Sequence, residues 1–252
     1  QASLGCPYSC SYYCTYGEYQ GPKIRQRSPK KVVDDILHVQ KEYGIKGIQF
    51  RDPTFGLNKA FIPSLCQEIK DRNVNIKWGM ETRLDLLNED NIKMMFDVGL
   101  RNINVGIETT DEEIAKMNKR KLISESHQEK IITLCEKLGI KISAFYILGY
   151  DKDNEKSVKA TINYARKLNT MTARFSVSTP YPGTGYYMQL EKEGRLLTKD
   201  WEKYSQFNLV YSHPNFSPEQ IKSLLGRAIR EYYFRPSYFW KVLKWKIREF
   251  WL

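Results

Sequence analysis

The sequence predicts an α/β protein in which the strands of a parallel sheet alternate with helices along the chain. Three joints carry this prediction, because at each one a glycine ends an amphipathic run and a β-rich run follows directly: Gly44, Gly99 and Gly139. Strands joined through helices at this spacing are expected to be parallel, with right-handed crossovers. We count six such units, fewer than the eight of a closed TIM barrel, so the chain is expected to form an open, partial (β/α)6 TIM-like barrel.

The predicted strands follow one another at regular spacing. They are the opening segment before Cys6 and the runs 47–50, 74–80, 103–107, 142–148 and 173–179. Ser28-Pro29 and Ser124 mark helix starts, since serine caps a helix N-terminus and proline fits the first turn. The chemistry of such a barrel is expected on the loops that follow the carboxyl ends of its strands.

Two regions are expected along the chain. Residues 1–190 are predicted to form the partial barrel and residues 191–252 a C-terminal helical extension. In the extension, Ser217 and Gln220 have the spacing of a capping box around Pro218, and Pro236 is expected to interrupt the helix. Only five residues precede Cys6, so we interpret the sequence as a fragment or an excised domain.

The chain is basic, with a formal net charge of +11 and a pI near 9.3. From Glu219 to the end, eight Lys or Arg stand against three acids, and aromatic residues such as Trp240, Trp245, Phe250 and Trp251 are interleaved with them. This pattern suits nucleic-acid bases or peripheral contact with an anionic membrane surface. We favour a third interpretation, a helix packed on the barrel or on another domain. No run of about 20 apolar residues occurs, so no membrane-spanning helix is predicted.

Three of the five cysteines stand within nine positions of one another: Cys6, Cys10 and Cys14. Three closely spaced thiolates can bind three irons of a [4Fe–4S] cluster and leave the fourth iron open for a small molecule. Structural zinc is the weaker interpretation, because no second cysteine pair or nearby histidine supplies a fourth ligand. A disulfide scaffold suits a short secreted chain, whereas this chain is long and has no apolar signal stretch at its start. A reducing, cytoplasmic location is therefore expected.

The cysteine run, Cys-Pro-Tyr-Ser-Cys-Ser-Tyr-Tyr-Cys, resembles the cluster loop of the radical SAM superfamily, and Tyr13 just before the last cysteine fits that pattern. The usual family spacing is three residues and then two, whereas here both gaps are three residues long. Together with residues 21–28 and Asp52-Pro53-Thr54-Phe55, the run is most similar to radical SAM enzymes that carry a cobalamin-binding domain ahead of the core. The resemblance covers about residues 1–190 and implies a partial (β/α)6 barrel, with a [4Fe–4S] cluster on the three cysteines and S-adenosylmethionine as cofactors.

The resemblance also implies a reaction. The reduced cluster passes one electron to the sulfonium, the S–C5′ bond breaks, and the adenosyl radical takes a hydrogen atom from a small-molecule, lipid-like or peptide substrate. A one-electron donor such as flavodoxin or ferredoxin is the implied partner. By analogy, a cobalamin-dependent full-length protein would transfer a methyl group, or rearrange or cyclise its substrate. No cobalamin-binding sequence precedes Cys6, so cobalamin is expected only through a domain ahead of Gln1.

Besides Tyr13, the resemblance implies contacts to S-adenosylmethionine from the ends of the second and third strands. Asp52 and Thr54 are the nearest polar residues where many members have a Gly-Gly-Glu segment, with turn capping as the alternative. Arg83 is a candidate for the methionyl carboxylate through its planar fork, with a salt bridge to Glu81 or Asp85 as the alternative.

Three further candidates come from later strand ends. Glu108 stands in Gly-Ile-Glu-Thr-Thr, similar to a Gly-x-Glu-Ser-Gly strand end of relatives in which the Glu contacts the cofactor. Ile147 on the fifth strand and Pro180 in a turn similar to the family's Pro-x-Pro-Gly-Thr are expected to frame the adenine.

The remaining cysteines and histidines are not assigned to a site. Cys66 and Cys135 fall in helical patterns and are predicted to be small core residues, and His38, His127 and His213 share no metal-site spacing. The competing function is a nucleic-acid-associated binding module whose cysteines hold a structural metal and which has no redox chemistry. The basic aromatic tail would be its contact surface.

Overall fold

The computed structural model describes residues 1–251, and the side chains of residues 9, 11 and 248–251 lie outside that description. The predicted tail residues Phe250 and Trp251 therefore fall outside the described side chains. The chain divides into two compact units, which are described separately. The first comprises residues 1–8, 19–106 and 123–143, and the second comprises residues 9–18, 107–122 and 144–252.

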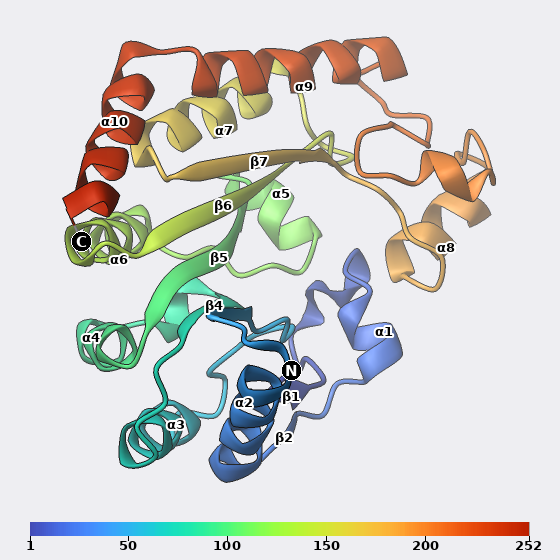
Figure 1. The fold of residues 1–252 in the computed structure, drawn as a ribbon. Coiled ribbons are helices and arrows are strands. Elements are labelled where there is room, and N and C mark those ends of the chain that lie inside the picture. The colour runs from blue at the N-terminus through green and yellow to red at the C-terminus, as the bar shows by residue number, and fades with distance from the viewer. Residues whose placement is uncertain (252) are drawn as a thin grey trace. The chain divides into compact units, whose positions relative to one another are not determined.

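Five strands form one sheet in sequential order (Figure 1). They are β3 (Gly47–Gln49), β4 (Lys77–Thr82), β5 (Leu100–Glu108), β6 (Lys141–Leu148) and β7 (Thr172–Val177). β3 pairs with β4, and β4 with β5, in parallel. A sheet in which each strand lies next to its neighbour in sequence is the order of a TIM-like barrel, so the predicted α/β fold class, a partial TIM-like barrel, is confirmed.

The first unit contains four helices besides its strands. These are α2 (Pro29–Tyr43), α3 (Phe61–Asp71), α4 (Glu89–Asp97) and α6 (Glu125–Leu138), with a short 3₁₀ turn η2 (Leu84–Leu86) after β4. The predicted caps of α2 and α6 are both present, since the Ser28 side chain accepts from the Lys31 amide and Ser124 from the His127 amide. Gly99 is required between α4 and β5, because a Cβ there would lie 2.0 Å from the Ile76 carbonyl oxygen.

The prediction that the opening segment is a strand of the sheet is wrong. β1 (Ser3–Leu4) pairs antiparallel with β2 (Arg25–Gln26) in a separate two-stranded sheet. Its backbone is held there because the Ala2 carbonyl accepts from the Arg27 amide, while the Ala2 amide and the Ser3 hydroxyl both donate to Asp52. Within the described residues the parallel sheet therefore has five strands rather than six.

The second unit contains the turn η1 (Ser9–Tyr12), α5 (Glu112–Met117), α7 (Glu155–Leu168), α8 (Gly185–Lys192) and η3 (Trp201–Lys203). The short helix α1 (Tyr16–Gln20) begins in this unit and ends in the first. The extension forms α9 (Pro218–Tyr233) and α10 (Pro236–Trp251), separated at Pro236 as predicted. The Ser217 and Gln220 capping box is formed in full.

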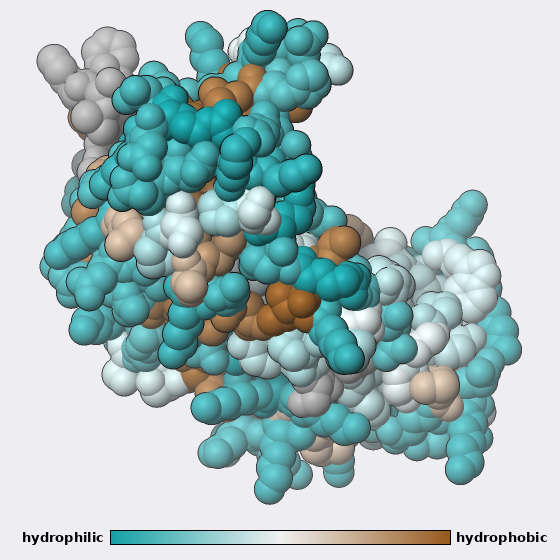
Figure 2. Space-filling view, turned by 90° about the horizontal axis from the view of Figure 1, so that it is seen from below, coloured by the Kyte–Doolittle hydropathy of each residue, from teal (hydrophilic) through white to brown (hydrophobic). Residues whose placement is uncertain are grey.

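Several aromatic residues of the extension pack against the end of α7 and the start of β7. The hydroxyls of Tyr232, Tyr233 and Tyr238 donate to the carbonyl oxygens of Thr170, Ala173 and Met171. These contacts support the interpretation that the tail packs on the barrel. On the face shown in Figure 2 the surface is largely hydrophilic, with small separate hydrophobic areas. No helix among the described residues is long and apolar enough to cross a membrane.

Candidate functional site

The first cysteine is held by a tight turn of the first unit. The Cys6 amide donates to the Gly21 carbonyl oxygen at 3.0 Å, and the Gly5 amide donates to the Gln20 side chain. Gly5 adopts φ +88°, and a Cβ there would lie 2.0 Å from the Lys23 carbonyl oxygen. The Cys6 Sγ is buried and lies 4.0 Å from the Thr54 hydroxyl. Only glycine therefore fits the position that presents Cys6.

The other two cysteines share one helical turn. The amides of Tyr13 and Cys14 both donate to the Cys10 carbonyl oxygen, at 3.1 and 3.0 Å. Residues four apart on such a turn present their side chains on one side. The additional residue in the Cys10 to Cys14 gap is thus absorbed by an i to i+4 turn that presents the two thiols on the same side.

Four buried or half-buried side chains gather behind this turn in the second unit. The Tyr13 ring meets the Tyr150 ring edge to face, with centroids 5.8 Å apart. Arg120 Nη1 lies 3.5 Å from the Tyr13 hydroxyl and 3.7 Å from Glu108 Oε1, and the Tyr150 hydroxyl lies 3.5 Å from Glu108 Oε2. Glu108 is the predicted site residue of β5, and Arg120 and Tyr150 were not predicted.

Electrostatics fix the charge state of this group. Burial raises the pKa of the Tyr13 hydroxyl well above its usual range, with Glu108 adding to the effect and Arg120 opposing it. Burial also raises the pKa of Tyr150. Burial alone would lower the pKa of Arg120, but the nearby Glu108 carboxylate outweighs it together with smaller contributions, so the net shift is upward. Arg120 is therefore a permanent cation between neutral tyrosines and a carboxylate.

The backbone at Glu108 is strained. This last residue of β5 has φ +73°, a left-handed conformation that a residue with a Cβ rarely adopts. The next amide, that of Thr109, donates to the Ile107 carbonyl oxygen at 3.0 Å, which closes the turn. Strain of this kind persists only where the surroundings enforce it and is common at ligand sites.

The predicted residues of the first unit have identified partners. Both oxygens of the buried Asp52 carboxylate accept hydrogen bonds, from the Ala2 amide at 2.9 Å and the Ser3 hydroxyl at 2.6 Å. The Thr54 hydroxyl donates to the Pro53 carbonyl oxygen at 2.7 Å. Asp52 thus holds the opening segment, 50 residues away, rather than capping its own turn, and contact of Asp52 and Thr54 with S-adenosylmethionine stays a prediction.

Arg83 also shows its alternative role. It forms two hydrogen bonds of 2.9 Å with Asp85, so the predicted salt bridge is made with Asp85. Its guanidinium also lies 4.4 Å from the ring centroid of Tyr8, which belongs to the cysteine run. Arg83 therefore supports the run through the Tyr8 ring as well as pairing with Asp85.

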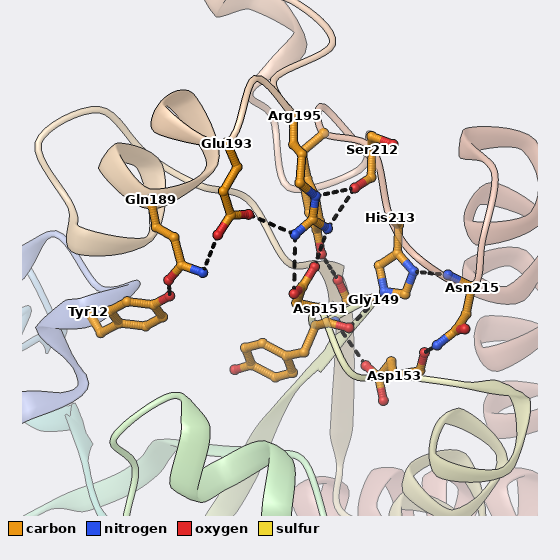
Figure 3. Close-up of polar contacts among 12 residues, drawn as sticks. Tyr12, Gly149, Asp151, Asp153, Gln189, Glu193, Arg195, Ser212, His213 and Asn215 are labelled. Atoms are coloured by element: carbon orange, nitrogen blue, oxygen red, sulfur yellow. Dashed lines mark hydrogen bonds and ion pairs between the residues drawn. The ribbon is translucent and has the colours of Figure 1, made fainter.

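A polar network fixes the loop after β6 (Figure 3). Arg195 pairs with Asp151 and Glu193, and donates to the Ser212 carbonyl oxygen. Gln189 links Glu193 to Tyr12, since its amide donates to Glu193 at 2.8 Å and its oxygen accepts from the Tyr12 hydroxyl. The extension and α8 thereby connect the loop after β6 to the cysteine turn.

Two further contacts attach the same loop to the extension. His213 Nε2 lies 2.7 Å from the Tyr150 carbonyl oxygen, while its Nδ1 accepts from the Asn215 amide at 3.0 Å (Figure 3). Nε2 is therefore the protonated nitrogen, and burial lowers the pKa of this histidine. The Asn215 side chain donates to the Asp153 carbonyl oxygen at 2.8 Å. His213, to which the sequence assigned no role, is a structural anchor of the loop.

The last two predicted contacts lie on neighbouring elements of the second unit. Ile147 is half-buried on β6, and Pro180 is buried three residues beyond the end of β7. The Ser178 amide donates to the Leu148 carbonyl oxygen at 2.8 Å, which joins these two strand ends. Their roles toward adenine stay predictions.

The chemistry of the cysteine run suits an iron–sulfur cluster. All five cysteines are free thiols, and Cys66 and Cys135 lie in the helical core, where burial raises their pKa values to about 11 and about 12. Among the described residues, no three His, Cys, Asp or Glu side chains gather as one ion would require. An iron–sulfur cluster brings its own irons and sulfides between its ligands, and three soft thiolates suit it.

Comparisons with known proteins agree with this geometry. An uncharacterized methyltransferase of Pyrococcus horikoshii is 32% identical over 235 residues, which cover 93% of this chain and 51% of that protein. The bacteriochlorophyllide d C-12(1)-methyltransferase of Chlorobaculum tepidum is 25% identical, over 92% of this chain and 50% of that protein. The chain thus spans about half the length of these curated relatives.

A solved structure shows the same fold. It is the radical S-adenosylmethionine methyltransferase TsrM from Kitasatospora setae, with cobalamin and a [4Fe–4S] cluster bound. The TM-score is 0.76 at 19% identity, over 94% of this chain and 51% of that one. The family model of the radical SAM superfamily matches residues 2–165, well over half of the sequence. The cysteine run, the sequential parallel sheet and this match together establish that the chain belongs to the radical SAM superfamily.

Proposed function

We propose that this chain is the radical SAM core of an enzyme that cleaves S-adenosylmethionine reductively and starts radical chemistry on an organic substrate. The superfamily uses a [4Fe–4S] cluster and S-adenosylmethionine, as the resemblance implied. The observation that carries the proposal is the cysteine turn, in which Cys10 and Cys14 present their thiols on one side against the group formed by Tyr13, Glu108 and Arg120.

The three cysteines would hold the cluster. When bound, the cluster supplies one electron to the sulfonium of S-adenosylmethionine, which breaks the S–C5′ bond and yields the radical that abstracts hydrogen. Cys6 enters from a glycine turn that no other residue fits, and Cys10 and Cys14 enter from a closed helical turn. Both turns are closed by backbone hydrogen bonds, so each turn is formed before any ligand binds.

The residues behind the turn would orient the cofactor and exclude water. Glu108 would accept hydrogen bonds from the ammonium or ribose of S-adenosylmethionine, and its strained backbone supports this role. Arg120, which is paired with Glu108, would also hold the methionyl carboxylate, because it is a buried, permanent cation next to the cysteine turn. Tyr13 and Tyr150, both neutral, would close the apolar side of the site.

The remaining predicted contacts belong to this proposal with smaller roles. Asp52, Thr54 and Arg83 are expected to contact the cofactor, and Ile147 and Pro180 to frame the adenine. Arg83 and Asp52 already have strong partners, so their expected contribution is chiefly to position the cysteine run.

In the whole protein we propose methyl transfer as the reaction, with cyclisation or rearrangement as the alternative. The support is that two relatives and one solved structure of this fold carry methyltransferase in their names, one with cobalamin bound. Cobalamin would bind to a part of the protein outside this sequence. The substrate would be a small organic molecule, and a small electron-transfer protein such as flavodoxin or ferredoxin would supply the electron.

The competing function, a nucleic-acid-associated module with a structural metal, is not supported. The family match overturns it, and several tail aromatics that would have stacked on bases are packed against the chain instead.

Peripheral membrane contact through α10 stays a prediction. Its exposed side chains include Phe239, Trp240, Leu243 and Ile247 together with the cations Lys244 and Lys246, a composition typical of interfacial helices. Cosedimentation with anionic but not zwitterionic vesicles is the expected result, and loss of that difference in Trp240→Glu would assign it to this helix.

The first experiment on the function is anaerobic iron–sulfur reconstitution followed by electron paramagnetic resonance of the dithionite-reduced protein. The expected result is a [4Fe–4S] signal that shifts when S-adenosylmethionine is added. Cys14→Ala should lose the signal, while Cys135→Ala, which removes a buried core thiol, should keep it. A signal that ignores S-adenosylmethionine, or that survives in Cys14→Ala, would overturn the proposal.

A further inference from the structure

The neighbouring strands β3, β4 and β5 carry two rows of polar side chains in the first unit (Figure 1). In the first row Gln49 lies opposite Gly79, and Gly79 opposite Asn102. In the second row Glu81 lies opposite Asn104. Residues two apart on a strand point to the same side, so both rows share one face of the sheet. We call this set, with the residue that pairs with Glu81, the polar face: Gln49, Arg51, Gly79, Glu81, Asn102 and Asn104.

The opposite face of the same strands is apolar. Phe50, Trp78 and Ile103 are buried there. The Phe55 ring lies 5.8 Å from the Trp78 ring and 5.7 Å from the ring of Phe61, which belongs to α3. The apolar core of the unit therefore lies on that side of the strands, and the polar face lies on the other side.

The side chains of the polar face contact one another across the strands. Asn102 Nδ2 lies 3.4 Å from Gln49 Oε1 and 3.1 Å from Asn104 Oδ1. Asn104 Nδ2 donates to Glu81 Oε1 at 3.3 Å, and Arg51 Nη1 is ion-paired with the same oxygen at 2.6 Å. These contacts orient the five side chains.

Two backbone features bring Gln49 and Asn102 together. Gly79 lies between them on β4, and a Cβ there would meet Gln49 Oε1 at 2.2 Å and the Asn102 Cβ at 3.1 Å. The register between β4 and β5 shifts after Trp78, so Asn102 rather than Arg101 lies opposite Gly79. Irregularities of this kind re-aim side chains and are common next to active sites.

The network leaves hydrogen-bonding atoms for a ligand. Within the described part of the chain, Asn102 Oδ1 and Glu81 Oε2 have no hydrogen-bond partner, and both remain accessible to solvent. Gln49 and Asn104 each use one of their two amide hydrogens. The polar face therefore offers two acceptors and two donors within two neighbouring rows.

The second row adjoins the segment that contacts Cys6. The Phe55 amide donates to the Glu81 carbonyl oxygen at 2.8 Å. Thr54, the preceding residue, has its hydroxyl 4.0 Å from Cys6 Sγ. A ligand on the polar face would therefore lie near one of the three thiols.

We propose that the polar face binds the substrate through an uncharged group whose neighbouring atoms both donate and accept hydrogen bonds. Sugar hydroxyls and peptide amides share this chemistry. The two rows suit an uncharged group, because Arg51 and Glu81 neutralise each other and Lys77 lies one row nearer the amino end of β4. An apolar group would cover the oxygens of Asn102 and Glu81 without pairing them, which costs free energy. This inference rests on the proposed function, because the polar face is a substrate site only if chemistry starts at the cysteines.

The test uses the full chain, reconstituted with cluster and S-adenosylmethionine, and anaerobic equilibrium dialysis with probes that share a 4-nitrophenyl group. The glucoside carries hydroxyls, N-acetylglycine 4-nitroanilide carries amides, the glucuronide is anionic, and the cyclohexyl ether is apolar. At least one uncharged polar probe should bind about tenfold more tightly than the ether and no more weakly than the glucuronide. The tighter of the two identifies hydroxyls or amides as the recognised group.

Two variants of different kinds should remove this preference. Asn102→Leu deletes the amide that contacts both rows. Gly79→Ala keeps every polar side chain but places a Cβ against the Gln49 amide. In each variant the affinity for the polar probes should fall to within about twofold of the affinity for the ether. Gln67→Leu is the matched control, because it removes an exposed amide of α3 that donates to Asp71, and it should change nothing.

Equal affinities for the polar probes and the ether, tighter binding of the glucuronide, or a preference that persists in either variant would overturn the proposal. Electron paramagnetic resonance on the same samples tests the proposed function separately. A preference for uncharged polar probes in a protein whose cluster ignores S-adenosylmethionine would overturn the substrate assignment and would leave the binding site itself established.

Discussion

Arg120 and Glu108 form a buried ion pair behind the cysteine turn, with Nη1 and Oε1 3.7 Å apart and side chains only 9% and 13% exposed. The pair joins the loop after α5 to the strained end of β5. A buried charge is tolerated only while its partner remains, since desolvation of a lone ion costs several kcal/mol. The pair therefore couples the stability of the second unit to two residues of the proposed cofactor site.

Removing both members should destabilise the protein by less than the two single losses added together. We expect Arg120→Met and Glu108→Gln each to lower the free energy of unfolding by about 3 kcal/mol, and the double variant to cost clearly less than their sum. Urea unfolding of the four proteins measures this coupling. The exposed pair of Lys93 and Glu89 on α4 is the control, and Lys93→Met should have little effect. Strictly additive losses would show that the two charges act independently.

Gly5→Ala should disrupt the entry of Cys6. The added Cβ would meet the Lys23 carbonyl oxygen at 2.0 Å on a backbone with φ +88°, so the turn must open. We expect a loss of about 2 kcal/mol or more in the free energy of unfolding and a clear loss of iron after reconstitution.

Gly194→Ala is the control variant, because it introduces backbone strain without a steric clash. Gly194 has φ +67°, but a Cβ at this position would meet no other atom within 4 Å, so only strain applies, at about 1 kcal/mol. Its iron content should equal that of the wild type. Equal iron content in Gly5→Ala would refute the role of this glycine in presenting the thiol.

Local signals in the sequence identified most of the fold. Each of these signals spans only a few neighbouring residues: the serine caps, the capping box of α9 and the glycine joints. Each is present in the structure. The prediction that the opening segment joins the parallel sheet was wrong because partners far along the chain decide its pairing. The main one is Asp52, whose carboxylate holds Ala2 and Ser3. No short-range pattern carries that information.

The site was predictable where a motif exists and not where the fold alone brings residues together. A cofactor contact of Glu108 is predicted from its strand-end pattern and stays a prediction. Its partner Arg120 was missed because it lies in the basic run Asn-Lys-Arg-Lys, which looks like a solvated turn. Arg195 was missed for another reason, since its partner Asp151 is 44 residues away. Apolar spacing in a sequence identifies the buried face of a helix, but no comparable sequence pattern identifies a buried cation.

Asp153 gives the stability a distinct pH dependence. It is 2% exposed, and burial raises the pKa of its carboxyl to about 6 despite hydrogen bonds from Ser157 and the Tyr150 amide. The unfolded value is about 3.9. The folded state therefore holds this proton more tightly, so the stabilising contribution is complete below about pH 4 and is lost as the pH rises through about 6.

Asp153→Asn removes this titration while retaining an acceptor and a donor. Relative to the variant, the wild type should lose about 2 to 3 kcal/mol of unfolding free energy between about pH 4 and pH 7. Urea unfolding of both proteins across that range is the measurement. Parallel pH profiles for the two proteins would show that Asp153 does not titrate in this window.

Arg195 should control the mobility of the loop after β6, because its single guanidinium bridges Asp151, Glu193 and the Ser212 carbonyl oxygen. We expect Arg195→Met to speed hydrogen exchange of amides 149–153 by about tenfold, corresponding to the loss of roughly one charge-assisted hydrogen bond. Arg195→Lys should restore little of the slow exchange, since the point charge of an ammonium group cannot bridge three acceptors as a planar guanidinium does. Arg227→Met, which breaks an exposed pair with Glu231 on α9, is the matched control and should leave these amides unchanged. If exchange at 149–153 stays slow in Arg195→Met, contacts such as those of Tyr211 and His213 hold the loop without Arg195, and the proposed role of this arginine is wrong.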